Sequence, residues 1–320
     1  MNRRDFLGMM GVGLAGVGGV RLPGGLLARR TPRLDGEVFV ERWSWAMGQP
    51  VHLQLFAESE SAGYEAAQAA LAELRRVEGA LSRFDDASDL SALNQRAGRA
   101  ALAVGQDLAS ALAAALRFQR TTGGAFNPAV EPLMRAWGFH APRTTEPTRA
   151  ELAEAEAAVR AAGIELHGTR VALKGASTRL DLGGIGVGYG LDRAGESLRR
   201  AGIRRAFLDV SGDCLALGAP PGEAGWLVEV ADPDREGAVL PGARTRLRDA
   251  ALATSSNLVS VVRYGRAVRG HVMDPVTGWP AAACRQVTVV ARTALEADAL
   301  STATLVEPRR FPGVLRVWTV

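Results

Sequence analysis

The sequence predicts an α+β fold, with helices mainly in the first half of the chain packed against a mixed or antiparallel sheet. Two observations support this class. Apolar residues spaced three and four apart, which indicate amphipathic helices, are concentrated before residue 204, and short segments of strand type separated by turn residues dominate after it. The chain also lacks a repeating alternation of strands and helices. With 320 residues, 47% hydrophobic and 22% charged, the composition excludes a disordered chain.

The N-terminal segment has the pattern of an export signal. Arg3 and Arg4 precede an apolar, glycine-rich run that ends at Val20. A paired arginine before a weakly hydrophobic run is typical of the twin-arginine route. The run is shorter than the roughly 20 apolar residues that a membrane span needs. Residues 1–34 are therefore predicted to be a signal and linker, and residues 35–320 the functional domain of an exported protein. An uncleaved signal anchor and a merely flexible N-terminus remain alternatives.

The basic character of the chain originates in this leader. Residues 1–34 contain six arginines and one aspartate, so the net charge of +4 becomes −1 once they are removed. A charge carried by a removable leader does not indicate polyanion binding, and we expect no nucleic-acid partner. Cys214 and Cys284 could pair once but are too few for a disulfide framework or a zinc site. Buried apolar positions are the favoured interpretation of both.

The first half of the chain predicts two strands and three helices. The strands are Val38–Ala46 and Val51–Ala57, on either side of a turn at Met47–Pro50, and the helices are Glu60–Leu81, Asp107–Thr121 and Thr148–Ala162. The third helix begins with a capping box, because Glu151 lies three residues after Thr148. Gly163 is expected to close it in the left-handed conformation.

The rest of the chain is predicted to be mostly strands. They are Ile164–Leu166, Arg170–Leu173, Arg179–Leu182, Ala206–Val210, Cys214–Leu217, Trp226–Ala231, Thr245–Thr254, Leu258–Tyr264, Arg269–Met273, Gln286–Ala291 and Val314–Val320. Two helices interrupt them, at Gly188–Ala201 and Ala294–Val306.

A glycine cluster at Asp181–Tyr189 lies between a predicted strand and a predicted helix. Glycines allow a backbone to approach a ligand closely, and a helix start offers free N–H groups to a phosphate. The dinucleotide-binding fingerprint fits poorly, because it belongs to the first strand of a repeating strand–helix–strand unit. A purely structural turn is the alternative.

Two further segments contain groups suited to catalysis or metal binding. His271, one of four histidines, ends a predicted strand before a sharp turn, where it is either a reactive group or simply a satisfied turn residue. Asp298 and Thr302 lie four residues apart on a predicted helix, so their oxygens share one face. A carboxylate and a hydroxyl in this arrangement suit Mg²⁺. The alternative is an acidic residue favoured by the helix dipole.

Six segments follow one another in a fixed order over nearly all of the chain after the leader. They are Met47-Gly48; Ser82-Arg83-Phe84 running to Ser88-Asp89-Leu90 and Leu93-Asn94; Gly124-Ala125-Phe126-Asn127-Pro128 with Pro132-Leu133 and Trp137-Gly138-Phe139; Asp181-Leu182-Gly183-Gly184; His271 with Asp274-Pro275 and Thr277-Gly278; and Ala297-Asp298 with Thr302. Together they resemble the ApbE family, the FAD:protein FMN transferases. The resemblance implies an ApbE-like, T-fold-like architecture.

The resemblance also implies an activity and its residues. Family members carry FAD and Mg²⁺, cut the FAD pyrophosphate, attach FMN through its phosphate to a threonine of a target protein, and release AMP. Here it assigns Mg²⁺ to Asp298, Thr302 and the carbonyl of Gly184, and the phosphoryl transfer to His271. It assigns the FAD site to Met47, Phe84, Ala125, Phe126, Asn127, Asp181, Val187 and Val272. The implied acceptor is a membrane or exported redox protein with a threonine-containing motif, so proximity to a membrane is implied as well.

Three positions depart from the family pattern. Val187 replaces a charged or polar residue, Asn127 replaces an aspartate, and Ser256 stands where the family has a glycine with more backbone freedom. An active flavin transferase outside the cytoplasm is the leading interpretation. A catalytically weakened FAD-binding protein that stores or senses flavin is the second, and an unrelated exported binding protein is the third.

Overall fold

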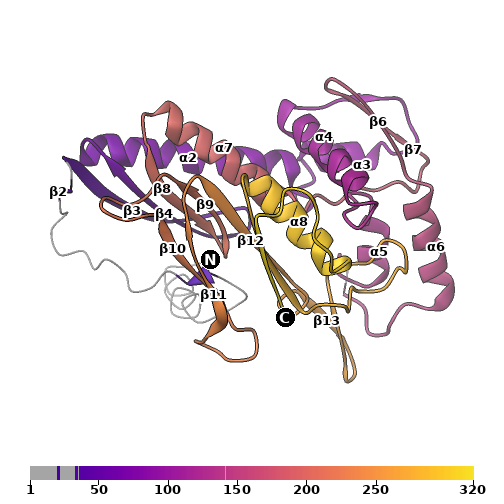
Figure 1. Ribbon diagram of the computed structural model, residues 1–320. Coiled ribbons are helices and arrows are strands. Elements are labelled where there is room, and N and C mark those ends of the chain that lie inside the picture. The colour runs from indigo at the N-terminus through magenta and orange to yellow at the C-terminus, as the bar shows by residue number, and fades with distance from the viewer. Residues whose placement is uncertain (1–19, 22–32, 35, 141) are drawn as a thin grey trace.

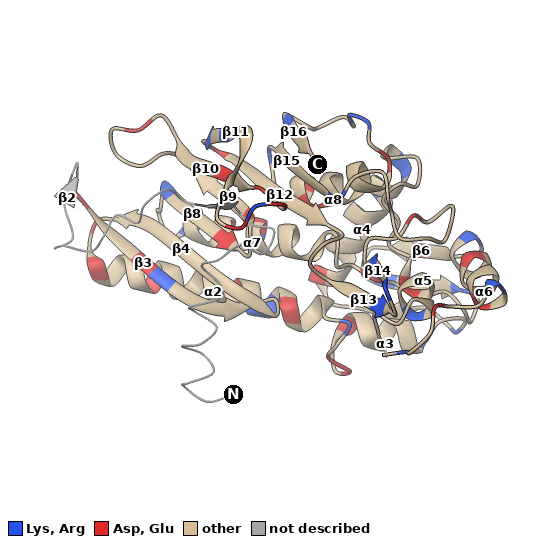
Figure 2. Ribbon diagram, turned by 90° about the horizontal axis from the view of Figure 1, so that it is seen from below, with Lys and Arg blue, Asp and Glu red and all other residues tan. Residues whose placement is uncertain are grey.

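The computed structural model describes residues 20–21, 33–34, 36–140 and 142–320, so most of the predicted leader lies outside the described residues. The predicted α+β class is confirmed: long helices lie along an antiparallel sheet, and a smaller helical lobe adjoins one end of it (Figure 1). No helix among the described residues is long and apolar enough to cross a membrane. In Figure 2 acidic and basic segments alternate along the elements in view, and no long basic stretch is visible there.

The main sheet has eight strands, and every neighbouring pair in it is antiparallel. Across the sheet the order is β16 (Arg316–Thr319), β15 (Gln286–Ala291), β12 (Ala250–Ser256), β9 (Asp213–Leu217), β8 (Arg205–Val210), β4 (Gln49–Ala57), β3 (Glu37–Ala46) and β2 (Arg33–Leu34). Strands distant in the chain thereby become neighbours, and residues 250–256 lie between residues 213–217 and 286–291.

Both faces of this sheet are packed, because side chains alternate along each strand. On β4, Leu53 and Leu55 belong to the main core beneath the helices α2 (Glu60–Leu81), α7 (Gly186–Arg200) and α8 (Ala294–Val306). Phe56 packs in a second cluster with Phe207 and Trp226. Trp226 belongs to the second sheet, formed by β1 (Val20–Arg21), β10 (Trp226–Ala231) and β11 (Val239–Leu247).

Three short elements of the smaller lobe, at Asp89–Gln95, Leu102–Ala103 and Glu131–Ala136, were not predicted by the sequence patterns. Its helices are α3 (Asp89–Gln95), α4 (Gln106–Thr121), α5 (Glu131–Ala136) and α6 (Arg149–Arg160); its strands are β5 (Leu102–Ala103), β6 (Gly163–His167), β7 (Arg170–Lys174), β13 (Val261–Tyr264) and β14 (Ala267–Gly270). Trp137, fully buried, follows α5, and its Nε1 donates to the carbonyl of Gly278 at 2.8 Å. The lobe is thereby fixed to the turn after His271.

The predicted capping box of α6 is confirmed, but the prediction for Gly163 is wrong. Thr148 and Glu151 hydrogen bond reciprocally at the start of the helix. Gly163 is not in the left-handed region: it begins β6 opposite Lys174, whose Cβ would lie 2.9 Å from a side-chain carbon added there. Ser256 ends β12 paired with Gln286, so this position needs no glycine freedom here.

Two predicted strands are also wrong. Arg179–Leu182 forms no strand, because the Asn94 side chain accepts from the Leu180 amide at 2.8 Å and donates to its carbonyl at 2.9 Å. Thr245–Thr254 is two strands, β11 and β12, broken at Asp249, whose φ is 48°. Asp249 accepts from the Gly218 amide at 2.9 Å, which holds the turn.

The ends of the other strands moved by a few residues. β13 begins only at Val261, and β14 ends at Gly270, so His271 and Val272 follow the strand. Gly270 packs so closely on Asn257 that an added Cβ would lie 2.3 Å from it. Cys214 is buried and Cys284 half-buried, and both are free thiols, so the possible disulfide does not form.

Candidate active site

The start of α7 lies directly on α8. Gly188 in the first turn of α7 donates its N–H to Asp298 Oδ2 at 2.9 Å. A Cβ at Gly188 would lie 2.3 Å from the Ala294 carbonyl oxygen and 2.8 Å from the Asp298 Cβ. Only a glycine permits this approach, which accounts for one glycine of the predicted cluster.

The three predicted metal ligands converge at this contact. A Cβ built on Gly184 would lie 2.9 Å from Thr302 Oγ1, so the glycine turn rests against the hydroxyl that follows Asp298 by one helical turn. Ser255 Oγ lies 3.1 Å from Thr302 Oγ1 and 2.7 Å from Ser301 Oγ. The structure therefore brings Gly184, from the turn before α7, together with Asp298 and Thr302 from α8, with a strand hydroxyl behind them.

Burial dominates the electrostatics of this site. Burial raises the pKa of Asp298 to about 7, and the charge of Asp192 adds to the rise. Burial and the charge of Asp298 likewise raise the pKa of Asp213, whose Oδ1 accepts from the Thr254 amide. A bound cation favours the ionised carboxylate.

The donor set fits a hard cation. One carboxylate, one hydroxyl and a nearby backbone turn supply only oxygen atoms, as Mg²⁺ prefers. Within the described residues no cluster of three or more His, Cys, Asp or Glu could hold a metal, so a site built on such a cluster is not available there.

Met47, in the turn between β3 and β4, lies over the start of α7. Met47, with a φ of 59°, and Gly48, with a φ of 67°, form the tight two-residue turn that the twist of the strands favours. A Cβ built on Gly190 would lie 3.7 Å from the Met47 sulfur. A Cβ built on Gly186 would lie 4.0 Å from the Met47 Cε. A non-glycine residue held at positive φ is a form of strain that concentrates at functional sites.

Asp181 opens the glycine turn and is held from several sides. Its side chain is 9% exposed, and Arg83 Nε lies 3.1 Å from its Oδ2. Its Oδ1 accepts from the Gly183 amide at 2.7 Å, and its own N–H donates to the carbonyl of Pro128. Burial opposes the charge, but the neighbouring cations and amide lower the pKa of Asp181, which is ionised.

Phe84 marks the rim of a pocket beside this carboxylate. Its ring is 80% exposed, and the Arg83 guanidinium lies 3.8 Å from the ring centroid. The pocket has a volume of about 410 Å³ and is lined by Arg83, Phe84, Asp86, Ser91, Asn94, Gln95, Glu131, Arg135, His140 and Arg179.

The charges of Asp181 and Arg83 act on the His271 imidazole. Burial lowers the pKa of His271, Asp181 opposes this, and Arg83 reinforces it, so the imidazole is neutral near pH 7. The edge of Phe139 packs against the ring at 6.5 Å between centroids. Nδ1 is buried and has no hydrogen-bond partner among the described residues. A neutral, partly unpartnered imidazole is suited to accept a proton.

The turn around His271 is fixed by backbone contacts. Val272 is buried, and its N–H donates to Asn257 Oδ1 at 2.8 Å. Asp274 Oδ1 accepts from the Val276 amide, and its Oδ2 accepts from the Thr277 hydroxyl.

The remaining predicted FAD residues have mixed environments. Ala125 and Phe126 are buried in the main core, and Phe126 lies 3.4 Å from a Cβ built on Gly184. Asn127 Oδ1 accepts from the Ala129 amide at 2.9 Å. Val187 is half-buried against the main core. The segment 125–128 therefore supports the glycine turn from behind.

Sequence patterns missed two residues of this site, Glu131 and His140. His140 Nδ1 lies 2.9 Å from Glu131 Oε1, and its Nε2 lies 3.6 Å from Asp181 Oδ2. The three residues are separated by up to 50 positions and share no motif, so only their position in the fold could reveal the group.

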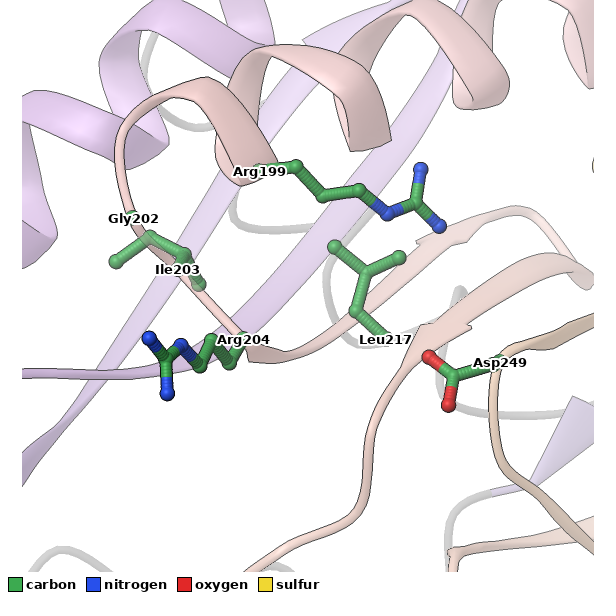
Figure 3. A pocket seen from close by; sticks show the side chains of 6 residues that line it. All are labelled: Arg199, Gly202, Ile203, Arg204, Leu217 and Asp249. Carbon is green, nitrogen blue, oxygen red and sulfur yellow. The ribbon is translucent and has the colours of Figure 1, made fainter.

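A second pocket lies far from these residues along the chain and contains none of the predicted site residues. It has a volume of about 390 Å³ and lies at the end of α7 (Figure 3), where Arg199, Gly202, Ile203, Arg204, Leu217 and Asp249 line it.

The chain is similar to known proteins over most of its length. A model of the ApbE family matches residues 47–314. The FAD:protein FMN transferase of Treponema pallidum (strain Nichols) is 32% identical over 266 residues, which cover 75% of this chain and 73% of that protein. The FAD:protein FMN transferase of Haemophilus influenzae is 28% identical over 237 residues, which cover 72% and 68%.

Solved structures show the same likeness. The ApbE protein from Thermotoga maritima has a TM-score of 0.77 and 30% identity, covering 84% of this chain and 86% of that one. The flavin transferase ApbE from Vibrio cholerae has a TM-score of 0.71 at 23% identity, covering 88% and 97%, a likeness of fold.

Proposed function

Because the chain belongs to the ApbE family, we propose that it is an FAD:protein FMN transferase that moves FMN from FAD to a threonine of an acceptor protein. The acceptor hydroxyl oxygen forms a bond to the FMN phosphorus, the pyrophosphate bond breaks, and AMP leaves with the bridging oxygen. The observation that supports this most directly is the convergence of Gly184, Asp298 and Thr302 at the start of α7.

Mg²⁺ is the metal that this donor set suits. Asp298 and Thr302 would hold it through their side chains, and Gly184 through its carbonyl. When bound, it neutralises charge on the phosphate oxygens during transfer. The chain's own contribution is to place these ligands beside the N-terminus of a helix, where the positive end of the dipole stabilises anionic groups.

His271 is proposed to take the proton of the acceptor threonine. It is neutral near pH 7 for the reasons given above, so it can act as a base. Phosphoryl transfer depends mainly on positioning, and the contacts around Val272 and Asp274 fix the turn that carries the imidazole.

FAD is proposed to bind across the glycine turn, with Met47 on one side and the pocket beside Phe84 on the other. The exposed Phe84 ring offers a stacking surface for a flat ring system. Asp181, Asn127, Val187, Ala125, Phe126 and Val272 are proposed to surround this path.

A catalytically weakened FAD-binding protein remains the second candidate, and Val187 is the observation that favours it. A half-buried valine offers a nucleotide no charge and no side-chain hydrogen bond. The discriminating experiment combines the protein, FAD, Mg²⁺ and an acceptor carrying a threonine motif. Release of AMP together with a fluorescent, flavin-labelled acceptor supports the transferase, and binding of FAD without AMP supports the weakened protein.

We also propose export by the twin-arginine route, and an exported or membrane redox protein as acceptor. The Arg3-Arg4 pair supports the route. Replacing both arginines with lysine keeps their charge but removes the paired guanidinium groups, and the variant should accumulate inside the cell with its leader attached. Unchanged export of this variant would rule out the route.

A further inference from the structure

The pocket beside Phe84 contains a chain of charges, buried at its centre, that the reaction above does not use. Arg135 pairs with Glu131 at 2.6 Å, Glu131 pairs with His140 at 2.9 Å, and His140 lies 3.6 Å from Asp181, which pairs with Arg83. The side chains of Glu131, His140 and Asp181 are 5%, 10% and 9% exposed. Charges at this depth interact more strongly than at the surface.

An imidazole between two carboxylates has one charge state that satisfies both. Neutral histidine carries a single N–H, so it can donate toward only one of Glu131 and Asp181. The imidazolium can donate to Glu131 Oε1 at 2.9 Å and pair electrostatically with Asp181 Oδ2 at 3.6 Å, a separation beyond hydrogen-bond distance. Burial and Arg83 lower the pKa of His140, but its interactions with Asp181 and Glu131 outweigh them, and the net direction is upward. The interactions with the two carboxylates therefore favour the imidazolium form of His140.

Asp181 connects this group to the site of transfer. Its Oδ2 faces His140 and Arg83, while its Oδ1 holds the Gly183 amide next to Gly184. Its charge acts on His271, whose pKa it raises against burial and Arg83. A group that fixes and partly neutralises Asp181 therefore influences both the glycine turn and the proposed base.

We propose that His140 is a positioning residue which, held between Glu131 and Asp181, fixes the Asp181 carboxylate at the start of the glycine turn, from which its charge acts on His271. The role of His140 in transfer rests on the proposed function, whereas its effect on the free protein does not. The charged groups facing His140 are Glu131 and Arg135 from α5, Asp181 before α7, and Arg83 after α2; Asp86 and Arg179 line the same pocket. Those acting on His271 are Asp181 and Arg83.

The test is an NMR titration of the histidine ring protons in the full chain without FAD or metal. Only four histidines are present, so substitution assigns each signal. In His140→Gln a neutral side chain replaces the imidazolium, and the uncompensated Asp181 should raise the His271 titration midpoint by roughly 0.5–1 pH unit. A midpoint that stays in place or moves to lower pH overturns the proposal.

Two further variants keep the test decisive. Glu131→Gln leaves the imidazole in place and removes one carboxylate, so the titration midpoint of His140 should fall. An unchanged His140 midpoint shows that Glu131 does not hold the imidazolium, and it overturns the proposal even if His140→Gln fails to fold. His167→Gln is the matched control, because His167 is exposed at the end of β6 and should leave the His271 midpoint unchanged.

Activity provides a separate readout. In His140→Gln the acid limb of AMP release should move to higher pH together with the His271 midpoint, and Arg83 and Phe84 should keep FAD affinity within a few-fold of the parent. If the His271 midpoint shifts but the parent protein never releases AMP, the positioning role of His140 is supported and the proposed transferase activity is rejected. An acid limb that stays in place while the His271 midpoint moves overturns the role of His140 in transfer.

Discussion

The backbone N–H of Gly188 donates to Asp298 Oδ2 at 2.9 Å, and this bond joins the first turn of α7 to the buried face of α8. One carboxylate oxygen is thus committed to the start of a helix, where the positive end of the dipole favours it. Oδ1 has no hydrogen-bond partner in the part of the chain that the structure describes, and it is the oxygen we assign to a cation.

Asp298→Asn tests the metal assignment without disturbing this bond. The amide oxygen still accepts from Gly188, and because burial raises the pKa of Asp298 to about 7, the neutral variant without metal should be at least as stable as the parent at pH 7. Loss of the charge should lower Mg²⁺ affinity at least tenfold, measured as the Mg²⁺ concentration needed for half-maximal AMP release. Asp298→Ala is less suitable, because it leaves the buried Gly188 N–H unpaired. Unaltered turnover at limiting Mg²⁺ would contradict the assignment.

Gly188→Ala tests the close approach of the two helices. The added carbon would lie 2.3 Å from the Ala294 carbonyl, so α7 must shift, and we expect a loss of roughly 2–4 kcal/mol in stability together with weaker Mg²⁺ binding. Gly79→Ala is the control, because Gly79 lies in α2 with nothing within 4 Å of an added Cβ. That change should stabilise the protein by roughly 0.5–1 kcal/mol. Equal denaturation midpoints for the two variants would count against this packing.

His271→Ala tests the proposed base. FAD affinity should be nearly unchanged, and transfer to the acceptor should fall by on the order of 10²–10⁴. Because burial lowers the pKa of His271, the parent's rate should rise with pH along a limb centred below 6.5. The control, His167→Ala, removes an exposed imidazole and should retain parental rates. An alanine variant at position 271 that is as fast as the parent would show that another group takes the proton.

Asp209→Asn tests a buried carboxyl away from the reaction. Asp209 accepts from the Gly212 amide at 2.7 Å, and burial raises its pKa to about 6. The folded protein therefore holds a proton that the unfolded chain releases near pH 4, so the parent loses stability as pH rises from 4 to 6. Asparagine accepts the same bond without charge. The variant should match the parent near pH 4 and exceed it by roughly 1–3 kcal/mol above pH 6. A stability difference that does not vary with pH would contradict the shift.

Local patterns were sufficient for elements that depend on local chemistry. The predicted bounds Glu60–Leu81 and Ala294–Val306 match the structure to the residue, and each helix begins directly after a side-chain cap, Ser59 or Thr293. Arg179–Leu182 failed for the opposite reason: its sequence suits a strand, but the Asn94 side chain takes the hydrogen bonds a neighbouring strand would use.

The candidate site divides in the same way. Asp298 and Thr302 were predictable as a pair because one helical turn separates them. Glu131 and His140 could not be predicted as site residues, because their proposed role depends on Asp181, which the fold brings to them from a distant segment.

The state of the two cysteines has a consequence for how the protein matures. Cys214 and Cys284 are both free, and burial raises the pKa of each thiol, which suppresses the reactive thiolate. Folding therefore requires no oxidant and no disulfide exchange. The chain can reach its native state in a reducing compartment and enter an oxidising one without covalent rearrangement, with the same thermal midpoint in the presence and absence of a reductant.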